Sequence, residues 1–353
     1  SVPGAPSRRG RRSGPAGGPL PPGPMPIFPS PAPSPPPATR TGALLLGAAA
    51  ALGAMALLNH AASRAAERRH PPRGRFLRVE GLDLHYLEQG DPGAPVVVLV
   101  HGNGAMAEDF AASGLMDRLA ARHRVIAFDR PGFGYTPRPR GRVWSADAQA
   151  ELLLAALRQL GIAKPVLVGH SWGVLVALAM ALRGGAGALV LLGGYALPQP
   201  RPDVLPPSLL ALPLLGDLLS HTVAPLLNRP LLPALLRRLF APRHITQGFR
   251  IGFPTELVLR PGSLRASGGD TALMIPSAAA LSPHYGGLDL PVTIMAGTGD
   301  RIVDTARQSA ALHRRLPRSR FLPLEDAGHM IHHTHTGAVA EAVESAAAPP
   351  PPG

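Results

Sequence analysis

The chain has 353 residues, of which 45% are hydrophobic and 16% charged, enough apolar material for one large domain or two ordinary ones. Its 35 basic and 22 acidic side chains give a formal net charge of +13, but only 4% of residues are aromatic, which disfavours a nucleic-acid-binding surface. It contains no cysteine, which excludes disulfides, thiolate metal sites and a cysteine nucleophile.

The positive charge is concentrated near the N-terminus, where residues 1–80 hold 11 arginines and two acidic residues. Residues 1–40 are rich in Pro, Gly, Ser and Arg, a composition that predicts a disordered or polyproline-like arm. Its arginine pairs at 8–9 and 11–12 suit either contact with anionic lipid or plain solvation. A short Pro-rich tail is expected at the other end, over residues 349–353.

Residues 41–59 contain no charged side chain. A helix of this length spans about 28 Å, close to the ~30 Å hydrocarbon core of a bilayer, so we expect a single-pass anchor that places the protein at a cell membrane. A cleaved signal peptide and a buried helix are the alternatives. Arginines flank the segment almost equally on both sides, so the positive-inside rule assigns no orientation. Residues 60–74 are expected to form a linker.

From residue 75 to 348 the pattern changes to short apolar runs separated by helical stretches. This alternation predicts one α/β domain with a mostly parallel sheet and right-handed crossovers. The first two runs suggest a meander, and the continuous apolar runs after them are typical of parallel strands that are covered on both faces. Eight strands are expected, at residues 75–79, 82–88, 95–100, 124–129, 165–170, 188–194, 291–297 and 320–324.

One long insertion interrupts the alternation. Residues 196–288 are rich in Leu and Pro and contain no convincing strand, so we expect a mainly helical cap over a hydrophobic pocket. A purely structural subdomain is the alternative. The helices of the domain itself are expected where apolar residues recur at a spacing near 3.6, at residues 105–122, 145–160, 172–182, 304–316 and 336–347.

The run Gly169-His170-Ser171-Trp172-Gly173 has the G-x-S-x-G pattern of a nucleophile elbow. An apolar strand leads into it and an apolar helix leaves it, which is the context that this motif requires. A serine hydroxyl is a weak nucleophile unless a base removes its proton, so a histidine and an acid are expected further along the chain. Ser171 is the candidate nucleophile.

The expected acid and base follow the last two strands. Asp300 comes directly after the seventh expected strand, and His329 follows the eighth. Both therefore lie at the carboxyl ends of core strands, so His329 is the candidate base and Asp300 the acid that orients it. Asp304 and Asp326 are the alternatives for the acid.

His101-Gly102-Asn103-Gly104 follows the third expected strand. A tetrahedral intermediate needs N–H donors for its oxyanion, and one such donor contributes roughly 3 kcal/mol. In an elbow of this kind the donors come from the loop after that strand and from the residue after the nucleophile. We therefore assign the oxyanion hole to the backbone N–H groups of Asn103 and Trp172, and we expect His101 to stabilise the loop.

Two further runs suggest ligand sites but fit structural roles better. The glycine-rich run at 129–134 lacks the Lys-Ser/Thr ending of a phosphate-binding loop and is interpreted as a tight loop at the pocket mouth. His329, His332, His333 and His335 crowd together as in a metal site, but no carboxylates or second ligand cluster accompany them at convincing spacing. We expect no metal, and we interpret the last three histidines as surface residues at the start of a helix.

Five motifs in this order resemble the α/β-hydrolase superfamily, in its cap-bearing fold-1 branch. They are HGNG at 101–104, DRPGFG at 129–134, GHSWG at 169–173, GTGD at 297–300 and AGHM at 327–330. The resemblance covers about residues 75–347 and implies a triad of Ser171, His329 and Asp300, a cap, no metal and no organic cofactor. The motifs are specific for the superfamily and unspecific for the substrate.

Departures from particular subfamilies narrow the expected activity. Haloalkane dehalogenases and epoxide hydrolases of this fold place Asp at the nucleophile, where this chain has Ser171. Its HGNGA and GHSWG differ from the HGGPG and GGSWG of proline iminopeptidases. We expect a membrane-anchored serine hydrolase that cleaves carboxylic esters of small lipophilic substrates, without a nucleic-acid partner. C–C bond hydrolysis, cofactor-free haloperoxidase chemistry and a non-catalytic ligand-binding protein are the alternatives.

Overall fold

The computed structural model describes Gly18, Gly23 and the continuous stretch 37–348. The predicted arm therefore lies outside the described residues except for the two glycines and its last four residues, and the predicted Pro-rich tail lies outside them entirely. The chain divides into two compact units between Ala48 and Ala49.

The first helix, α1 (Pro37–Arg69), contains the whole of the predicted anchor and continues beyond it. The prediction of a linker over 60–74 is wrong for its first ten residues, which are helical. This stretch consists largely of strong helix formers, and Arg64 pairs with Glu67 one turn further on. In the described part of the chain, Arg40–Arg69 is the one stretch of helix that is long and apolar enough to cross a membrane by itself.

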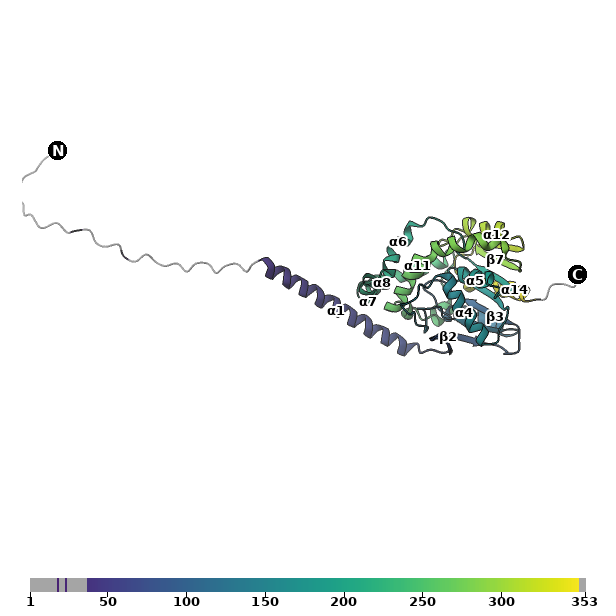
Figure 1. The fold of residues 1–353 in the computed structure, drawn as a ribbon, viewed down its shortest axis with the longest axis horizontal. Helices are drawn as coiled ribbons and strands as arrows, with labels where there is room; N and C mark the ends of the chain where they lie inside the picture. The colour runs from purple at the N-terminus through teal and green to yellow at the C-terminus, as the bar shows by residue number, and fades with distance from the viewer. Residues whose placement is uncertain (1–17, 19–22, 24–36, 349–353) are drawn as a thin grey trace, which may run out of the picture. The chain divides into compact units, whose positions relative to one another are not determined.

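All eight predicted strands are present and form one sheet, in the order β1-β2-β4-β3-β5-β6-β7-β8. Of these strands, β2, β3 and β7 are labelled in Figure 1. β2 pairs in the antiparallel direction with β1 and β4, and the other five neighbouring pairs are parallel. The strands are Arg75–Val79 (β1), Leu82–Gln89 (β2), Val96–Val100 (β3), Arg124–Phe128 (β4), Val166–His170 (β5), Ala188–Leu192 (β6), Val292–Gly297 (β7) and Ser319–Leu324 (β8).

Helices cover both faces of the sheet. Successive side chains of a strand point to opposite faces, so Val98 joins the core that includes α4 and α5, while Val97 joins the core that includes α3 and α14. This double coverage explains why the parallel strands are continuous apolar runs. The helices are α2 (Glu108–Ala112), α3 (Leu115–Ala120), α4 (Ala146–Gln159), α5 (Gly173–Leu182), α13 (Ile331–Thr334) and α14 (Thr336–Ala347).

Two predicted helices differ in detail from the structure. The helix expected at 105–122 is divided into α2 and α3, because Gly114 between them has φ +75°, a conformation that interrupts a right-handed helix. The helix expected at 304–316 begins with a π-helical turn, η4 (Ala306–Ala310), and continues as α12 (Ala311–Arg315).

The insertion between β6 and β7 is helical, as predicted, and residues 196–288 contain no strand. Its longest helix, α11, packs against α4 and α5 of the domain below it. Its elements are η1 (Pro202–Val204), α6 (Leu205–Ser208), η2 (Leu209–Ala211), α7 (Leu215–His221), α8 (Val223–Phe240), α9 (Gln247–Gly252), α10 (Thr255–Val258), α11 (Pro261–Leu281) and η3 (Ser282–Gly287).

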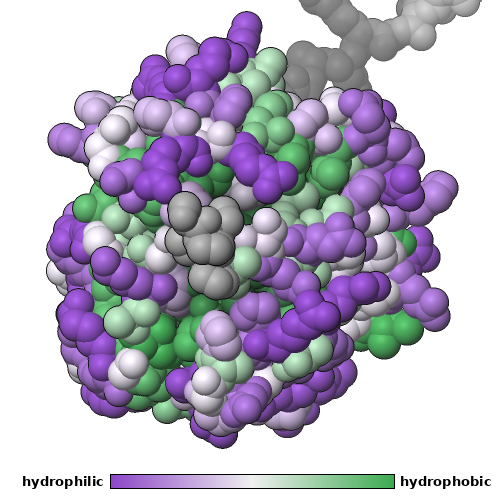
Figure 2. All heavy atoms as spheres, turned by 90° about the vertical axis from the view of Figure 1, so that its right-hand side faces the viewer, coloured by the Kyte–Doolittle hydropathy of each residue, from purple (hydrophilic) through white to green (hydrophobic). Residues whose placement is uncertain are grey.

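Exposed apolar residues are unevenly distributed. On the end of the domain that carries α12 and α14, hydrophilic residues are spread over the whole face, with apolar areas between them (Figure 2). By contrast, ten of the 18 large hydrophobic side chains exposed in the described chain lie between Leu205 and Leu235. The first part of the cap is therefore a concentrated apolar surface.

Candidate active site

Ser171 lies in the turn between β5 and α5 with φ +54°, a conformation that residues other than glycine rarely adopt. Glycines on both sides permit the tight turn. A Cβ on Gly173 would collide with the backbone carbonyl of Val100, and a Cβ on Gly169 would lie 2.8 Å from the carbonyl oxygen of Gly173. Ser171 is half-buried between two buried neighbours. The structure thus contains the strained turn that the G-x-S-x-G motif predicts.

Asp300 and His329, two of the predicted site residues, are in contact. Nδ1 of His329 lies 2.8 Å from Oδ2 of Asp300, and both side chains are almost wholly buried. Oδ1 of Asp300 accepts the backbone N–H groups of Ile302 and Val303. Burial alone would raise the pKa of Asp300, but the imidazole and these N–H donors outweigh it and hold the pKa below its usual value. The ionised carboxylate favours a proton on Nδ1 and leaves Nε2 free to accept one.

The two alternative acids lie away from His329. Asp304 is exposed, and its carboxylate accepts the backbone N–H of Arg307. Asp326 is also exposed and pairs with Arg243. Of the three candidates, Asp300 is the one whose carboxylate contacts the imidazole.

The backbone brings Ser171 to the same edge of the sheet as this pair. The N–H of Ser171 donates to the carbonyl of Leu192 at the end of β6. The next residue, Gly193, lies against the pair, since a Cβ there would be 3.5 Å from both Oδ2 of Asp300 and Nδ1 of His329. Within the described residues the Ser171 hydroxyl has no hydrogen-bond partner, so its contact with the imidazole is not made in this conformation; such contacts often tighten only when substrate binds.

The side chains of Asn103 and Trp172, the predicted oxyanion-hole residues, both bind the cap helix α11. The amide of Asn103 donates to Oγ1 of Thr271 at 3.0 Å and to the carbonyl of Ser267 at 3.2 Å. The indole N–H of Trp172 donates to the carbonyl of Asp270 at 2.9 Å. Neither backbone N–H has an acceptor in the part of the chain that the structure describes. α11 therefore positions both residues while their N–H groups stay available.

A buried ion pair that joins α11 to the sheet is missed by sequence reasoning. The guanidinium of Arg130, which follows β4, lies 2.6 Å from the carboxylate of Asp270, and both side chains are fully buried. Arg130 also donates to the carbonyls of His101 and Gly102, at 2.9 and 2.8 Å. The pair therefore supports the loop that carries Asn103. The one signal in the sequence is the arginine in DRPGFG, a run interpreted as structural.

His101 has the loop-stabilising role that its position predicts. Burial, together with the neighbouring Arg130, lowers the pKa of His101 to about 4, so the ring is neutral near pH 7. Its Nδ1 donates to the carbonyl of Gly102 at 2.8 Å, and its Nε2 accepts the backbone N–H of Arg130 at 3.0 Å. The ring thus links the end of β3 to the end of β4.

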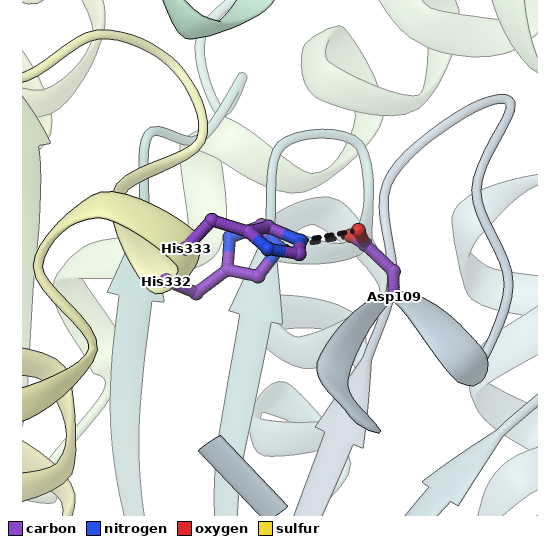
Figure 3. A group of neighbouring side chains, drawn as sticks. All are labelled: Asp109, His332 and His333. Atoms are coloured by element: carbon purple, nitrogen blue, oxygen red, sulfur yellow. Dashed lines mark hydrogen bonds and ion pairs between the residues drawn. The ribbon is translucent and has the colours of Figure 1, made fainter. Parts of the chain in front are cut away.

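The prediction that His332 and His333 are surface residues is wrong, because both are buried and face Asp109 of α2 (Figure 3). Nε2 of each ring lies 2.8 Å from a different oxygen of the Asp109 carboxylate. Burial alone would raise the pKa of Asp109, but the two imidazoles hold it well below its usual value. A buried carboxylate needs donors, and this requirement turns both histidines inward. His335, the third of the set, is partly exposed.

These three side chains also have the donor set of a metal site, since their ligand atoms lie within 4.8 Å of one another. A histidine that binds a metal through Nε2 normally donates its Nδ1–H to an acceptor. The Nδ1 atoms of His332 and His333 are buried and have no partner among the described residues. The group therefore fits direct hydrogen bonding to Asp109 better than metal ligation.

His170, the residue before Ser171, lies between this group and the candidate base. Its ring centroid is 4.3 Å from that of His332 and 4.9 Å from that of His329. Burial lowers the pKa of His170 well below its usual value, and the nearby imidazoles lower it further, so the ring is neutral. Its Nε2 donates to the backbone carbonyl of His329 at 3.1 Å. Buried histidines therefore support the backbone that carries His329.

An open pocket of about 910 Å³ is lined by the loop at 132–138, the start of α11 and the end of α1. Its wall includes Arg138 and Arg260 and does not include Ser171. The loop after β4 thus lines a pocket, as its position suggests, but this pocket has charged groups in its wall and lies away from the candidate nucleophile.

The sequence pattern of the α/β-hydrolase fold matches residues 95–336, more than half of the chain. The protein therefore belongs to the α/β-hydrolase fold family. The eight-stranded sheet and the helical insertion described above agree with this membership and with the resemblance of the five motifs.

Known proteins share this fold with different chemistries. A 2-hydroxy-6-oxononadienedioate/2-hydroxy-6-oxononatrienedioate hydrolase of Pseudomonas putida is 38% identical over 34% of this chain and 44% of its own length. The chain spans less than half the length of several curated relatives that it matches. The crystal structure of an enol-lactonase from Burkholderia xenovorans has a TM-score of 0.65 at 21% identity and covers 76% of this chain and 98% of its own. A membrane phospholipase A has a TM-score of 0.58 at 21% identity and covers 87% and 99%. At these identities the two structures show the fold alone.

Proposed function

We propose that the protein is a membrane-anchored serine hydrolase that cleaves carboxylic esters. The observation that carries the proposal is the strained turn at Ser171 next to the buried pair of His329 and Asp300. In this mechanism the Ser171 oxygen attacks the acyl carbon while Nε2 of His329 takes its proton. Asp300 keeps the imidazole in the required tautomer and stabilises the imidazolium.

The remaining steps use residues of the same site. The attack places negative charge on the former carbonyl oxygen, and the backbone N–H groups of Asn103 and Trp172 donate to it. The intermediate collapses, the ester C–O bond breaks, and His329 protonates the leaving alcohol. Water, activated by the same imidazole, then hydrolyses the acyl-enzyme, which releases the carboxylic acid and restores Ser171.

Two features support membrane anchoring and a lipophilic substrate. α1 contains a stretch, Arg40–Arg69, that is long and apolar enough to cross a bilayer. The cap exposes a concentration of leucines between Leu205 and Leu235. A chain that combines an apolar helix with an apolar cap suits esters of acyl chains that partition into the bilayer.

Fluorophosphonate labelling of the full chain in detergent tests the proposal. The probe reacts with an activated serine, so the wild-type chain is expected to label and Ser171→Ala is not. Ser208→Ala, which changes a serine of the cap, is the matched control and is expected to label like the wild type. Equal thermal melting curves for the three proteins establish that each is folded. A folded wild-type chain that does not label contradicts the serine-hydrolase proposal.

Cleavage of a C–C bond is the second candidate, favoured by the 38% identity to the hydrolase of Pseudomonas putida. The same serine, histidine and aspartate serve both reactions. A panel of p-nitrophenyl esters of increasing acyl length, compared with a 2-hydroxy-6-oxo-dienoate substrate, separates them. We expect the highest kcat/KM for a long-chain ester; a higher value for the dienoate would replace ester hydrolysis by C–C hydrolysis.

A further inference from the structure

An apolar surface covers the first part of the cap. Within the described residues of the unit 49–353, five large hydrophobic side chains outside this surface are exposed. Monomeric soluble proteins seldom expose a large contiguous apolar patch, and such a patch marks an interaction surface. We call it the leucine face; it lies on the adjoining elements α6, η2, α7 and α8 and the loop between η2 and α7, and its residues are Leu205, Leu209, Leu212, Leu214, Leu215, Leu218, Leu226, Leu227, Leu231 and Leu235.

On α8 three of the four exposed leucines form a stripe. Leu227, Leu231 and Leu235 are four residues apart, so they lie along one side of the helix. Ala224 and Phe240, near the two ends of the helix, are buried. α8 is therefore packed against the body of the protein while this row of leucines faces outward.

Asn59 of α1 attaches that helix to the leucine face. Its side chain is buried and donates to the carbonyls of His221 and Thr222, at 2.9 and 2.7 Å, where α7 ends and α8 begins. The two residues before it, Leu57 and Leu58, are 72% and 66% exposed. Asn59 therefore marks the point at which the apolar stretch of α1 ends and contact with the cap begins.

Cationic side chains accompany the leucines. Arg229, Arg237 and Arg238 of α8 are exposed, and none of them forms an ion pair within the described part of the chain. The guanidinium of Arg238 donates to the backbone carbonyl of Arg301. Unpaired arginines next to exposed leucines suit the boundary of a bilayer, where the leucines contact acyl chains and the guanidinium groups bind lipid phosphates.

We propose that the leucine face lies on the bilayer, immersed in the headgroup and upper acyl region of the leaflet that α1 enters. The inference rests on the membrane anchoring proposed above and extends it from α1 to the cap. If the apolar stretch of α1 lies in the hydrocarbon, the α7–α8 junction bonded to Asn59 lies at the membrane surface, so the adjoining leucines meet lipid instead of water. Pro202–Ala211 and Leu215–His221 together also have the apolar character of a membrane segment, broken by a 91° bend, which fits an element that enters one leaflet and does not cross.

The absence of cysteine makes site-specific labelling direct. The full chain is reconstituted in vesicles of equal parts phosphatidylcholine and phosphatidylglycerol, with an NBD fluorophore on Leu227→Cys or Leu231→Cys. Arg158→Cys, near the end of α4 and exposed, is the matched control, and Ala51→Cys reports on α1. Each label is exposed in turn to lipids that carry a nitroxide near the top of the acyl chain and to aqueous iodide.

We expect the lipid nitroxide to quench the labels at positions 51, 227 and 231, with protection from iodide, and the reverse at position 158. Lipid quenching at 51 with iodide-accessible labels at 227 and 231 would overturn the membrane contact of the leucine face and leave the anchor intact. Iodide access at position 51 as well would overturn the anchoring itself. Pyrene is also attached to each single variant, Leu227→Cys or Leu231→Cys. Excimer fluorescence from either one would identify a second copy of the chain as the occupant of the leucine face and would also overturn the inference.

Discussion

Asp270 of the cap helix α11 and Arg130 of the loop after β4 form an ion pair of 2.6 Å in which both side chains are fully buried. Arg130 also binds the carbonyl of Gly102, and the backbone carbonyl of Asp270 accepts the indole N–H of Trp172. One ion pair therefore connects the cap to both sides of the candidate oxyanion hole. Separating the two residues would leave uncompensated charges, so α11 forms a fixed wall of the site.

Asp270→Asn is expected to lower the free energy of unfolding by about 3–5 kcal/mol, because it leaves the Arg130 guanidinium buried without its counter-charge. Asp203→Asn is the matched control: this carboxylate pairs with Arg201 at the surface, and its loss is expected to change stability by at most about 0.5 kcal/mol. Equilibrium urea unfolding in detergent measures both. Equal free energies of unfolding for the two variants would show that the buried ion pair stabilises the fold no more than the surface pair does.

Asp300→Asn is expected to reduce the rate of fluorophosphonate labelling on the order of 10⁴-fold, because an amide no longer selects the Nδ1–H tautomer of His329 or stabilises the imidazolium. Asp304→Asn changes the exposed alternative acid and is expected to label at the wild-type rate. Time courses of labelling at several probe concentrations give the rate constant for each variant. A large loss with Asp304→Asn and none with Asp300→Asn would show that Asp304, and not Asp300, is the acid that orients His329.

Glu108 of α2 is expected to make stability depend on pH. Burial, reinforced by repulsion from Asp129, raises the pKa of Glu108 from 4.5 to about 7, and its Oε2 has no hydrogen-bond partner within the described residues. A raised pKa means that the folded state favours the protonated acid, so this stabilisation is complete below pH 4.5 and is lost as the pH rises through about 7.

Glu108→Gln, which stays neutral, is therefore expected to be more stable than the wild type at about pH 8, by up to about 3 kcal/mol, and equally stable near pH 4. Glu341→Gln changes an exposed acid of α14 and is expected to follow the wild type throughout. Thermal melting across this pH range provides the comparison. A constant difference between Glu108→Gln and the wild type would rule out titration of Glu108 as the cause.

Asp109→Asn is expected to destabilise the fold by about 2–4 kcal/mol, since one amide oxygen cannot accept from both His332 and His333 and its NH₂ group faces a donor. Asp117→Asn, an exposed change on α3, is the control. Urea unfolding of both variants gives the difference. A chelator is expected to leave the wild-type stability unchanged, and a loss of stability with chelator would show that the three side chains bind a metal.

Much of the fold is predictable from the sequence because its signals are local. Each buried parallel strand is a continuous apolar run such as 96–100, and the turn at Ser171 is specified by the glycines two residues away on either side. Asp300 and His329 are found by their positions directly after strands. The extension of α1 beyond residue 59 carries a local signal as well, a run of alanines with Arg and Glu, which the expectation of a linker overlooked.

The sequence by itself determined the α/β class, the eight strands and the helical insertion, and it predicts Ser171, Asp300 and His329 as the site residues. Only the tertiary structure decided how the site is supported. Arg130 meets Asp270 across 140 residues of sequence, and Asp109 meets His332 across 223. The physical reason is that a buried charge must pair with a group on the element that packs beside it. The spacing of residues in the sequence does not predict which distant element that is.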